Sequence, residues 1–106
     1  MKICITSNGD SPDSAVDPRF GRCKYFAIYD TDSDSFEFIE NPNKDAVSGA
    51  GVLSAQFIIE KGCRYVITDR VGPKAREALE AGRVNIIEEV KGTVKSVIED
   101  FKKNDI

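Results

Sequence analysis

Histidine and tryptophan are absent from this 106-residue chain, and cysteine is scarce. Without histidine the chain lacks the usual general base near neutral pH and the commonest metal-ligating side chain, which excludes Ser-His and Cys-His nucleophilic catalysis. The three cysteines (Cys4, Cys23 and Cys63) are an odd number at wide spacing with no C-x-x-C pair. This spacing argues against a secreted disulfide framework and a zinc ribbon. We therefore expect free thiols.

The chain also lacks an excess of positive charge and any long apolar segment. Its 15 basic and 18 acidic residues give a formal net charge of −3, so neither nucleic acid nor a membrane surface is expected as a partner. The longest apolar stretches, such as residues 52–59, fall far below the ~20 residues that a membrane-spanning helix requires. The first residues turn polar too soon for a secretory signal peptide. These absences predict a cytoplasmic protein.

The composition that remains is that of an ordinary folded domain. The length allows one hydrophobic core and is too short for two, so we expect a single domain over residues 1–106. Apolar, β-branched and aromatic runs predict strands over residues 2–7, 25–30, 36–40, 64–68 and 84–87. The polar turn at residues 31–35 makes residues 25–40 an antiparallel hairpin.

Glycines mark the boundaries of three predicted helices. These helices lie between Gly51 and Gly62, between Gly72 and Gly82, and after Gly92. Right-handed crossovers through the later helices connect parallel strands and place helices on both faces of the sheet. The sequence therefore predicts an α/β fold with a mixed five-stranded sheet that contains one antiparallel strand, and residues 2–7 near its middle.

Three cations lie together with a thiol in the loop over residues 17–24. Arg19, Arg22 and Lys24 could hold an anion through charge-assisted hydrogen bonds. The simpler interpretation is that they are solvated and pair with nearby acidic residues, because exposed ion pairs are common and weak. Charge alone favours the simpler interpretation. The longer segment over residues 8–22, which overlaps this loop, lacks periodic apolar positions. We therefore expect it to be the least ordered internal segment.

Ligands of such sheets bind beyond the carboxyl ends of the parallel strands, which gathers the loops after residues 6, 68 and 87 on one rim. Two predicted helix starts, Gly72-Pro73 and Gly92-Thr93, would present unpaired N–H groups there, although plain capping explains them equally well. We expect one concavity at this rim to be lined by Arg19, Arg22, Gly49, Gly51, Gly72 and Gly92.

The cysteines divide into two kinds. Cys4 and Cys63 fall in predicted strands and are expected to be small buried hydrophobes. Cys23 has cationic neighbours that would favour its thiolate, the form that binds soft metals, although burial under Phe20 or Phe26 would undo this. We expect Cys23 to be the one accessible, metal-ligating thiol.

Six segments in order resemble the family of dinitrogenase iron-molybdenum cofactor biosynthesis proteins. They are the opening strand, Ser14-Ala15-Val16-Asp17 before Phe20-Gly21-Arg22, Glu40-Asn41-Pro42, Ser48-Gly49-Ala50-Gly51, Val71-Gly72-Pro73-Lys74-Ala75 and Gly92-Thr93-Val94. The resemblance implies a ribonuclease H-like three-layer fold and an anionic metal-sulfur cluster that is bound and not turned over. It implies cofactor-binding roles for Arg19, Phe20, Gly21, Arg22, Ser48, Gly49, Gly51, Gly72, Pro73, Gly92 and Thr93.

The chain departs from the family pattern at two kinds of position. Arg19 and Ser48 stand where members often have histidine, and Asp69-Arg70 replaces the usual Gly-Gly. Cluster coordination through imidazole is therefore impossible here.

The leading hypothesis is a carrier of an iron-molybdenum or other metal-sulfur cluster, without enzymatic activity, which exchanges its cargo with a protein donor or acceptor. The alternative is a metal-free regulatory or protein-interaction module of the same fold. A nuclease is disfavoured, because Lys2, Cys4 and Thr6 occupy the first strand, where two-metal chemistry needs carboxylates.

Overall fold

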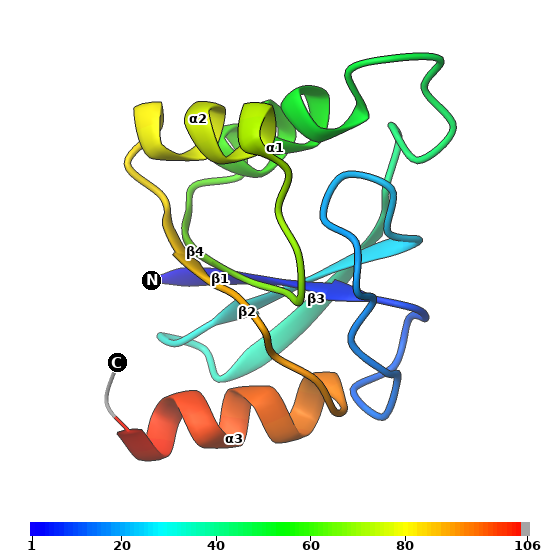
Figure 1. Cartoon of the computed structure of the whole chain (residues 1–106). Coiled ribbons are helices and arrows are strands. Elements are labelled where there is room, and N and C mark those ends of the chain that lie inside the picture. Colours follow the sequence, from blue (N-terminus) through cyan, green and yellow to red (C-terminus); the bar gives the residue numbers. More distant parts are fainter. Residues whose placement is uncertain (105–106) are drawn as a thin grey trace.

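A five-stranded mixed sheet forms the centre of the fold in the computed structural model, which describes residues 1–104. The strand order is β3-β2-β1-β4-β5, and β1 is central (Figure 1). The strands are β1 (Lys2–Ser7), β2 (Tyr25–Asp30), β3 (Ser35–Glu40), β4 (Cys63–Ile67) and β5 (Asn85–Ile87). β1, β4 and β5 run parallel, and β2 runs antiparallel to both β1 and β3. The predicted α/β fold and mixed sheet with one antiparallel strand are confirmed.

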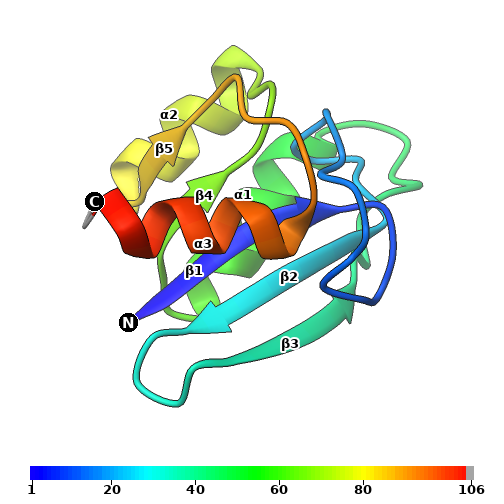
Figure 2. The ribbon, with the colours of Figure 1, turned by 90° about the horizontal axis from the view of Figure 1, so that it is seen from below.

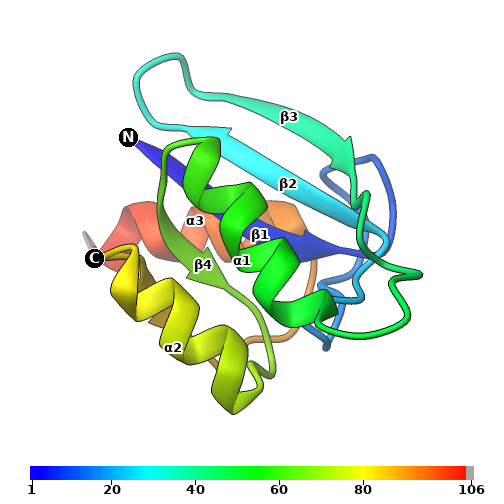
Figure 3. The same ribbon diagram turned by 90° about the horizontal axis from the view of Figure 1, so that it is seen from above.

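Helices cover both faces of this sheet. They are α1 (Ala50–Glu60), α2 (Pro73–Ala81) and α3 (Val94–Asn104). α1 and α2 lie side by side over one face (Figure 3), and α3 crosses the other face (Figure 2). The three layers predicted from the resemblance are present, whereas the ribonuclease H-like label stays a prediction. None of the helices in residues 1–104 has the length and apolar character of a membrane-spanning segment.

The alternation of β1 divides the core into two clusters. Cys4 faces the α1–α2 side, where it packs with Phe26 and Leu79. Ile3 and Ile5 face the α3 side, where Val94, Ile98 and Phe101 cover them. Each fully buried aliphatic or aromatic side chain stabilises the fold by about 1.5–3 kcal/mol, so both helical layers are held mainly by these residues.

The helix boundaries follow the predicted glycines with one exception. Gly62, in the left-handed region at φ +82°, follows the end of α1. Gly72 is the N-cap of α2 with Pro73 as its first residue, and Gly82 is its C-cap. The exception is Gly51, which lies inside the first turn of α1 because the helix already begins at Ala50.

The loop over residues 8–22 is tied down, contrary to the expectation of a loosely held segment. Its backbone exchanges hydrogen bonds with three parts of the chain, including Asp17 N–H to the Thr6 carbonyl (2.9 Å) and Arg70 N–H to the Pro18 carbonyl (3.0 Å). The buried hydroxyls of Thr6 and Thr68 lie 2.7 Å apart, and Thr6 Oγ1 donates to the Asp17 carbonyl. The loop has no periodic apolar side chains to bury, and it is held instead by backbone hydrogen bonds to segments distant in the chain.

Candidate functional site

The starts of α1 and α2 meet the 19–22 loop around an open concavity of about 510 Å³. α1 follows β3 and α2 follows β4, and the carboxyl ends of these two strands lie at the same edge of the sheet. The N-termini of both helices therefore lie at this edge. The lining residues are Arg19, Phe20, Arg22, Gly49, Ala50, Gly51, Val52, Gly72, Pro73, Lys74 and Ala75. None of these residues is acidic.

Both helices present free backbone donors to the concavity. The N-caps Gly49 and Gly72 carry no side chain that could bond the first turn. Among residues 1–104, no acceptor bonds the first-turn N–H groups of Ala50, Gly51, Val52, Lys74 and Ala75. Two sets of N–H groups and two positive helix-dipole ends therefore face one space, which favours an anion.

Small residues allow the three segments to approach closely. Gly21 has φ +104°, and a Cβ there would lie 2.9 Å from the Gly51 Cα. A Cβ on Gly51 would lie 3.0 Å from the Cβ of Ala75. The 19–22 loop, α1 and α2 are thus packed backbone against backbone, with no room for a side chain between them.

The turn at Gly21 is fixed from behind by two buried polar side chains. The Gly21 carbonyl accepts hydrogen bonds from Asn41 Nδ2 (2.9 Å) and from Ser54 Oγ (2.9 Å). Asn41 Nδ2 also donates to the Cys23 carbonyl at 3.0 Å. No local sequence pattern predicted a role for Asn41 or Ser54. A pattern that could have indicated both residues is a polar side chain next to, or within, an apolar segment, where a buried hydrogen bond is expected.

Two arginines of the loop are tethered, yet their charge reaches solvent. The Arg19 N–H donates to the buried Asp17 carboxylate at 3.1 Å, and its guanidinium, 3.8 Å from the same oxygen, belongs to a side chain that is 63% exposed. Arg22 Nη1 donates to the Lys44 carbonyl at 3.0 Å. Lys74, which belongs to a segment that carries the family resemblance but was given no binding role, adds a third cation and forms no ion pair within residues 1–104.

Glu88 holds the loop that leads into α2. Its carboxylate accepts the Val71 N–H at 3.0 Å and pairs with the Arg76 guanidinium. Val71 directly precedes Gly72, so these contacts position the start of α2 at the concavity. Glu88 was not predicted as a site residue, because no local sequence pattern relates a residue after β5 to the loop after β4.

The structure brings together seven of the residues predicted for cofactor binding: Arg19, Phe20, Arg22, Gly49, Gly51, Gly72 and Pro73. Gly21 lies directly behind this lining, and Ser48 is exposed outside it. The prediction that Gly92 shares the concavity is wrong, and Thr93 is also elsewhere. These two residues lead into α3 on the opposite face of the sheet, where Gly92 accepts the Val16 N–H and Thr93 pairs with Ala15.

The prediction that Cys23 is accessible and thiolate-prone is also wrong. Its side chain is 0% exposed in the core under α1, as are those of Cys4 and, nearly so, Cys63. Burial raises the pKa of the Cys23 thiol to about 12, and the negative charge of Asp17 adds to this rise. Arg19 and Arg22 line the concavity, and neither is among the groups that shift the pKa of Cys23. The predicted metal ligand therefore loses its physical basis.

The chain is similar to several known proteins over most of its length. A family model described as dinitrogenase iron-molybdenum cofactor matches residues 1–104. The structure of the apo form of the orange protein from Desulfovibrio gigas superimposes with a TM-score of 0.92 at 31% identity, covering 97% of this chain and 88% of that one. A Thermotoga structure described as a NifB protein gives a TM-score of 0.84 at 38% identity, covering 96% and 87%.

One curated relative is an uncharacterized protein of Methanocaldococcus jannaschii. It is 32% identical over 78 residues, which are 71% of this chain. The chain spans 63% of the length of that relative.

Proposed function

The chain belongs to the dinitrogenase iron-molybdenum cofactor family, and from this premise we propose that it carries an anionic metal-sulfur cluster, or a precursor of an iron-molybdenum cofactor, in the concavity between α1 and α2. The observation that carries the proposal is the lining itself. Arg19, Arg22 and Lys74 surround two helix starts with unpaired N–H groups, and the lining contains no carboxylate. The Asp17 carboxylate that pairs with Arg19 is buried outside the lining. An otherwise acidic chain thus concentrates positive charge at one place.

The donor set suits a cluster that brings its own sulfide ligands. The lining contains no thiol, imidazole, carboxylate or hydroxyl. Residues 1–104 hold no group of three or more histidine, cysteine, aspartate or glutamate side chains that could bind a metal ion. Hydrogen bonds from N–H groups and guanidinium charges would hold the sulfide surface, while no protein atom coordinates the metal. Affinity should consequently fall as salt screens the charges.

The same lining supports holding the cargo and not transforming it. General acid-base and nucleophilic catalysis need a titratable or nucleophilic group beside the reacting atom. The glycine, alanine, valine, proline and phenylalanine residues of the lining supply none. Its remaining side chains are the cations Arg19, Arg22 and Lys74, to which our proposal gives the role of holding the anion. The open concavity would leave part of the cargo free for exchange with a protein donor or acceptor.

Anaerobic titration with tetrathiomolybdate, a molybdenum centre surrounded by sulfide, tests the proposal. Binding is measured from the absorption spectrum of the thiomolybdate, and we expect it to be saturable. In an Arg22→Gln/Lys74→Gln double variant the affinity should fall at least about tenfold. A matched control, Arg64→Gln/Lys103→Gln, removes the same charge from exposed positions away from the concavity and should bind like the wild type. Equal affinity of the two double variants would contradict the proposed site.

A protein-interaction module of the same fold is the second candidate. It is favoured by two exposed apolar side chains that are close in the chain to lining residues, Val47 (102% exposed), two residues before Gly49, and Leu53 (41%), directly after Val52. Two results for the wild-type protein together would favour this candidate. The protein would bind no thiomolybdate, and metal analysis after anaerobic expression would find no metal-sulfur cluster.

A further inference from the structure

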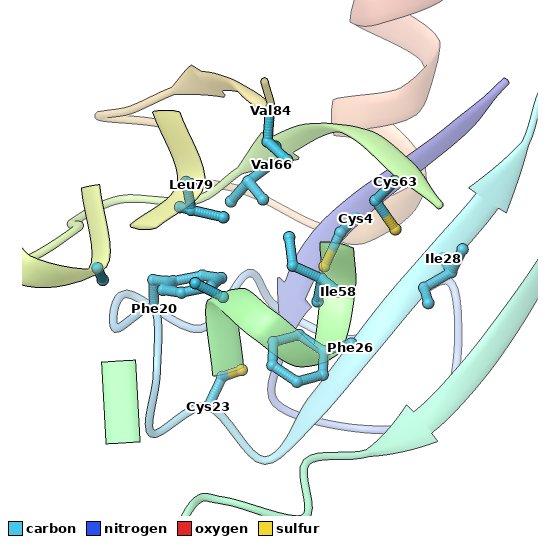
Figure 4. Close-up of a cluster of buried hydrophobic side chains, with 12 residues drawn as sticks. Cys4, Phe20, Cys23, Phe26, Ile28, Ile58, Cys63, Val66, Leu79 and Val84 are labelled. Carbon is cyan, nitrogen blue, oxygen red and sulfur yellow. The ribbon is translucent and has the colours of Figure 1, made fainter. Parts of the chain in front are cut away.

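All three cysteines lie in one buried cluster, and the proposed cargo site uses none of them. Cys4 comes from the central strand β1, and Cys63 is the first residue of β4. Figure 4 shows these two side chains leaving neighbouring strands on the same side, with their sulfurs next to each other. Cys23 comes from the loop before β2 and lies beside Phe26 (Figure 4).

A strand irregularity is what turns Cys63 toward Cys4. Side chains alternate along a regular strand, so Cys63 and Val66, three positions apart, would face opposite sides. The register shifts here, because Lys2 pairs with Cys63 while Ile3 pairs with Tyr65. The extra residue in β4 places both Cys63 and Val66 on the face of Cys4. Re-aiming a side chain in this way is a recognised role of β-bulges.

The two thiols lie in the same cluster, each affects the pKa of the other, and they differ in character. The hydrogen bond from the Cys4 thiol lowers the pKa of Cys63, helped by the charge of Lys2 and opposed by burial. Burial, and secondly the same hydrogen bond, raises the pKa of Cys4. Cys63 is 5% exposed and stands between the exposed Gly62 and Arg64, whereas Cys4 is fully buried. Of these two thiols, Cys63 is the one nearer to solvent and the more readily ionised, so we assign to it the attack on an external reagent.

We propose that Cys4 and Cys63 are an oxidisable dithiol that closes to a disulfide between β1 and β4 on reaction with a low-molecular-weight disulfide. The Cys63 thiolate attacks one sulfur of the reagent and releases the other as a thiolate, which leaves a mixed disulfide on Cys63. Cys4 then loses its proton to the released thiolate and attacks the Cys63 sulfur, expelling the second reagent thiol. One reagent disulfide is reduced to two thiols, and the protein loses two hydrogen atoms.

This modification site is separate from the cargo site. Cys63 pairs with Lys2 at the amino ends of the two parallel strands, and the concavity lies beyond their carboxyl ends. The proposal therefore stands or falls independently of cluster binding.

Non-reducing peptide mapping of the native full chain tests it. Wild-type protein is incubated with glutathione disulfide, its remaining thiols are alkylated at low pH, and it is digested with trypsin. The three cysteines fall in different tryptic peptides, residues 3–19, 23–24 and 62–64. We expect a linked 3–19/62–64 pair, unmodified Cys23, and the same linked pair in Cys23→Ser. In Cys4→Ser the reaction should stop at a glutathione adduct on Cys63, and Cys63→Ser should leave Cys4 unmodified.

The proposal would be overturned if all three cysteines of the folded wild-type protein remained free thiols after the incubation. Linked peptides that contain Cys23 would overturn it as well. A digest of protein oxidised in urea controls for pairing that does not depend on the fold, because all three thiols are then exposed. The wild-type and Cys23→Ser maps decide the matter even where Cys4→Ser or Cys63→Ser folds poorly.

Discussion

Asn41 donates a hydrogen bond from Nδ2 to the carbonyl oxygen of Gly21 at 2.9 Å, although the two residues are 20 positions apart in the chain. Asn41 directly follows β3, the edge strand of the hairpin, and Gly21 forms the turn between Phe20 and Arg22 of the concavity. One buried amide thus couples the hairpin to the segment that carries the arginines.

Asn41→Ala should destabilise the fold by about 1–3 kcal/mol, because it leaves buried carbonyl groups of Gly21 and Cys23 without this donor. Urea denaturation followed by circular dichroism measures the loss. Asn43→Ala is the matched control, since Asn43 offers only its backbone N–H to Asn41 Oδ1. Similar midpoints for the two variants would show that the Asn41 hydrogen bonds contribute little.

Two glycines with positive φ should respond differently to alanine. Gly49→Ala is expected to cost about 1–2 kcal/mol from backbone strain alone, because nothing lies within 4 Å of the added Cβ. Gly21→Ala should cost more, since the same strain is joined by a 2.9 Å contact with the Gly51 backbone. Gly72→Ala, which has neither problem, should stay within about 0.5 kcal/mol of the wild type. Thermal unfolding ranks the three variants, and equal losses for Gly21→Ala and Gly49→Ala would contradict the close packing.

The buried thiol of Cys23 should make part of the stability pH-dependent. Its pKa is raised from 9.0 to about 12 in the folded protein, so above pH 9 the unfolded chain loses a proton that the folded chain keeps. The stability that the neutral buried thiol contributes is fully present below the pKa of Cys23 in the unfolded chain. It is lost as the pH rises toward the pKa in the folded protein, and the free energy of unfolding falls by at most about 1.4 kcal/mol per pH unit. Urea unfolding of wild type and Cys23→Ala at pH 7, 9 and 10.5 measures it. Between pH 9 and pH 10.5 the variant should lose less free energy of unfolding than the wild type. An equal loss in the two proteins would contradict a buried neutral thiol.

Glu88→Ala should loosen the loop before α2, because Val71 N–H and Arg76 lose their shared partner. Both side chains of the ion pair are about one third exposed, so solvent screening limits the expected loss to about 1 kcal/mol. Faster amide hydrogen exchange at Val71 is the local readout. Glu88→Gln keeps an acceptor for Val71 and should exchange more slowly than Glu88→Ala. Unchanged exchange in both variants would argue against the positioning role of Glu88.

The sequence alone predicted the fold with few errors. The bounds of β1 and β2 agree with the structure, and the mixed sheet follows from a polar turn in the hairpin and from glycines that end helices. It also predicted that Arg19, Arg22, Gly49, Gly51 and Gly72 share one concavity, which the lining confirms. These predictions succeed because periodicity, turn chemistry and the position of loops at the carboxyl ends of parallel strands are local or topological properties.

Tertiary structure decided what local pattern could not. Cys23 lies in a cationic segment, yet long-range packing under α1 buries its thiol and reverses the direction of its pKa shift. Gly92 begins a helix like Gly72, but α3 crosses the opposite face of the sheet and carries that start away from the concavity. Cys63 joins Cys4 through one extra residue in β4. Which face an element covers, and which side chains it buries, depends on partners distant in the chain, and that information is not written in any local stretch of sequence.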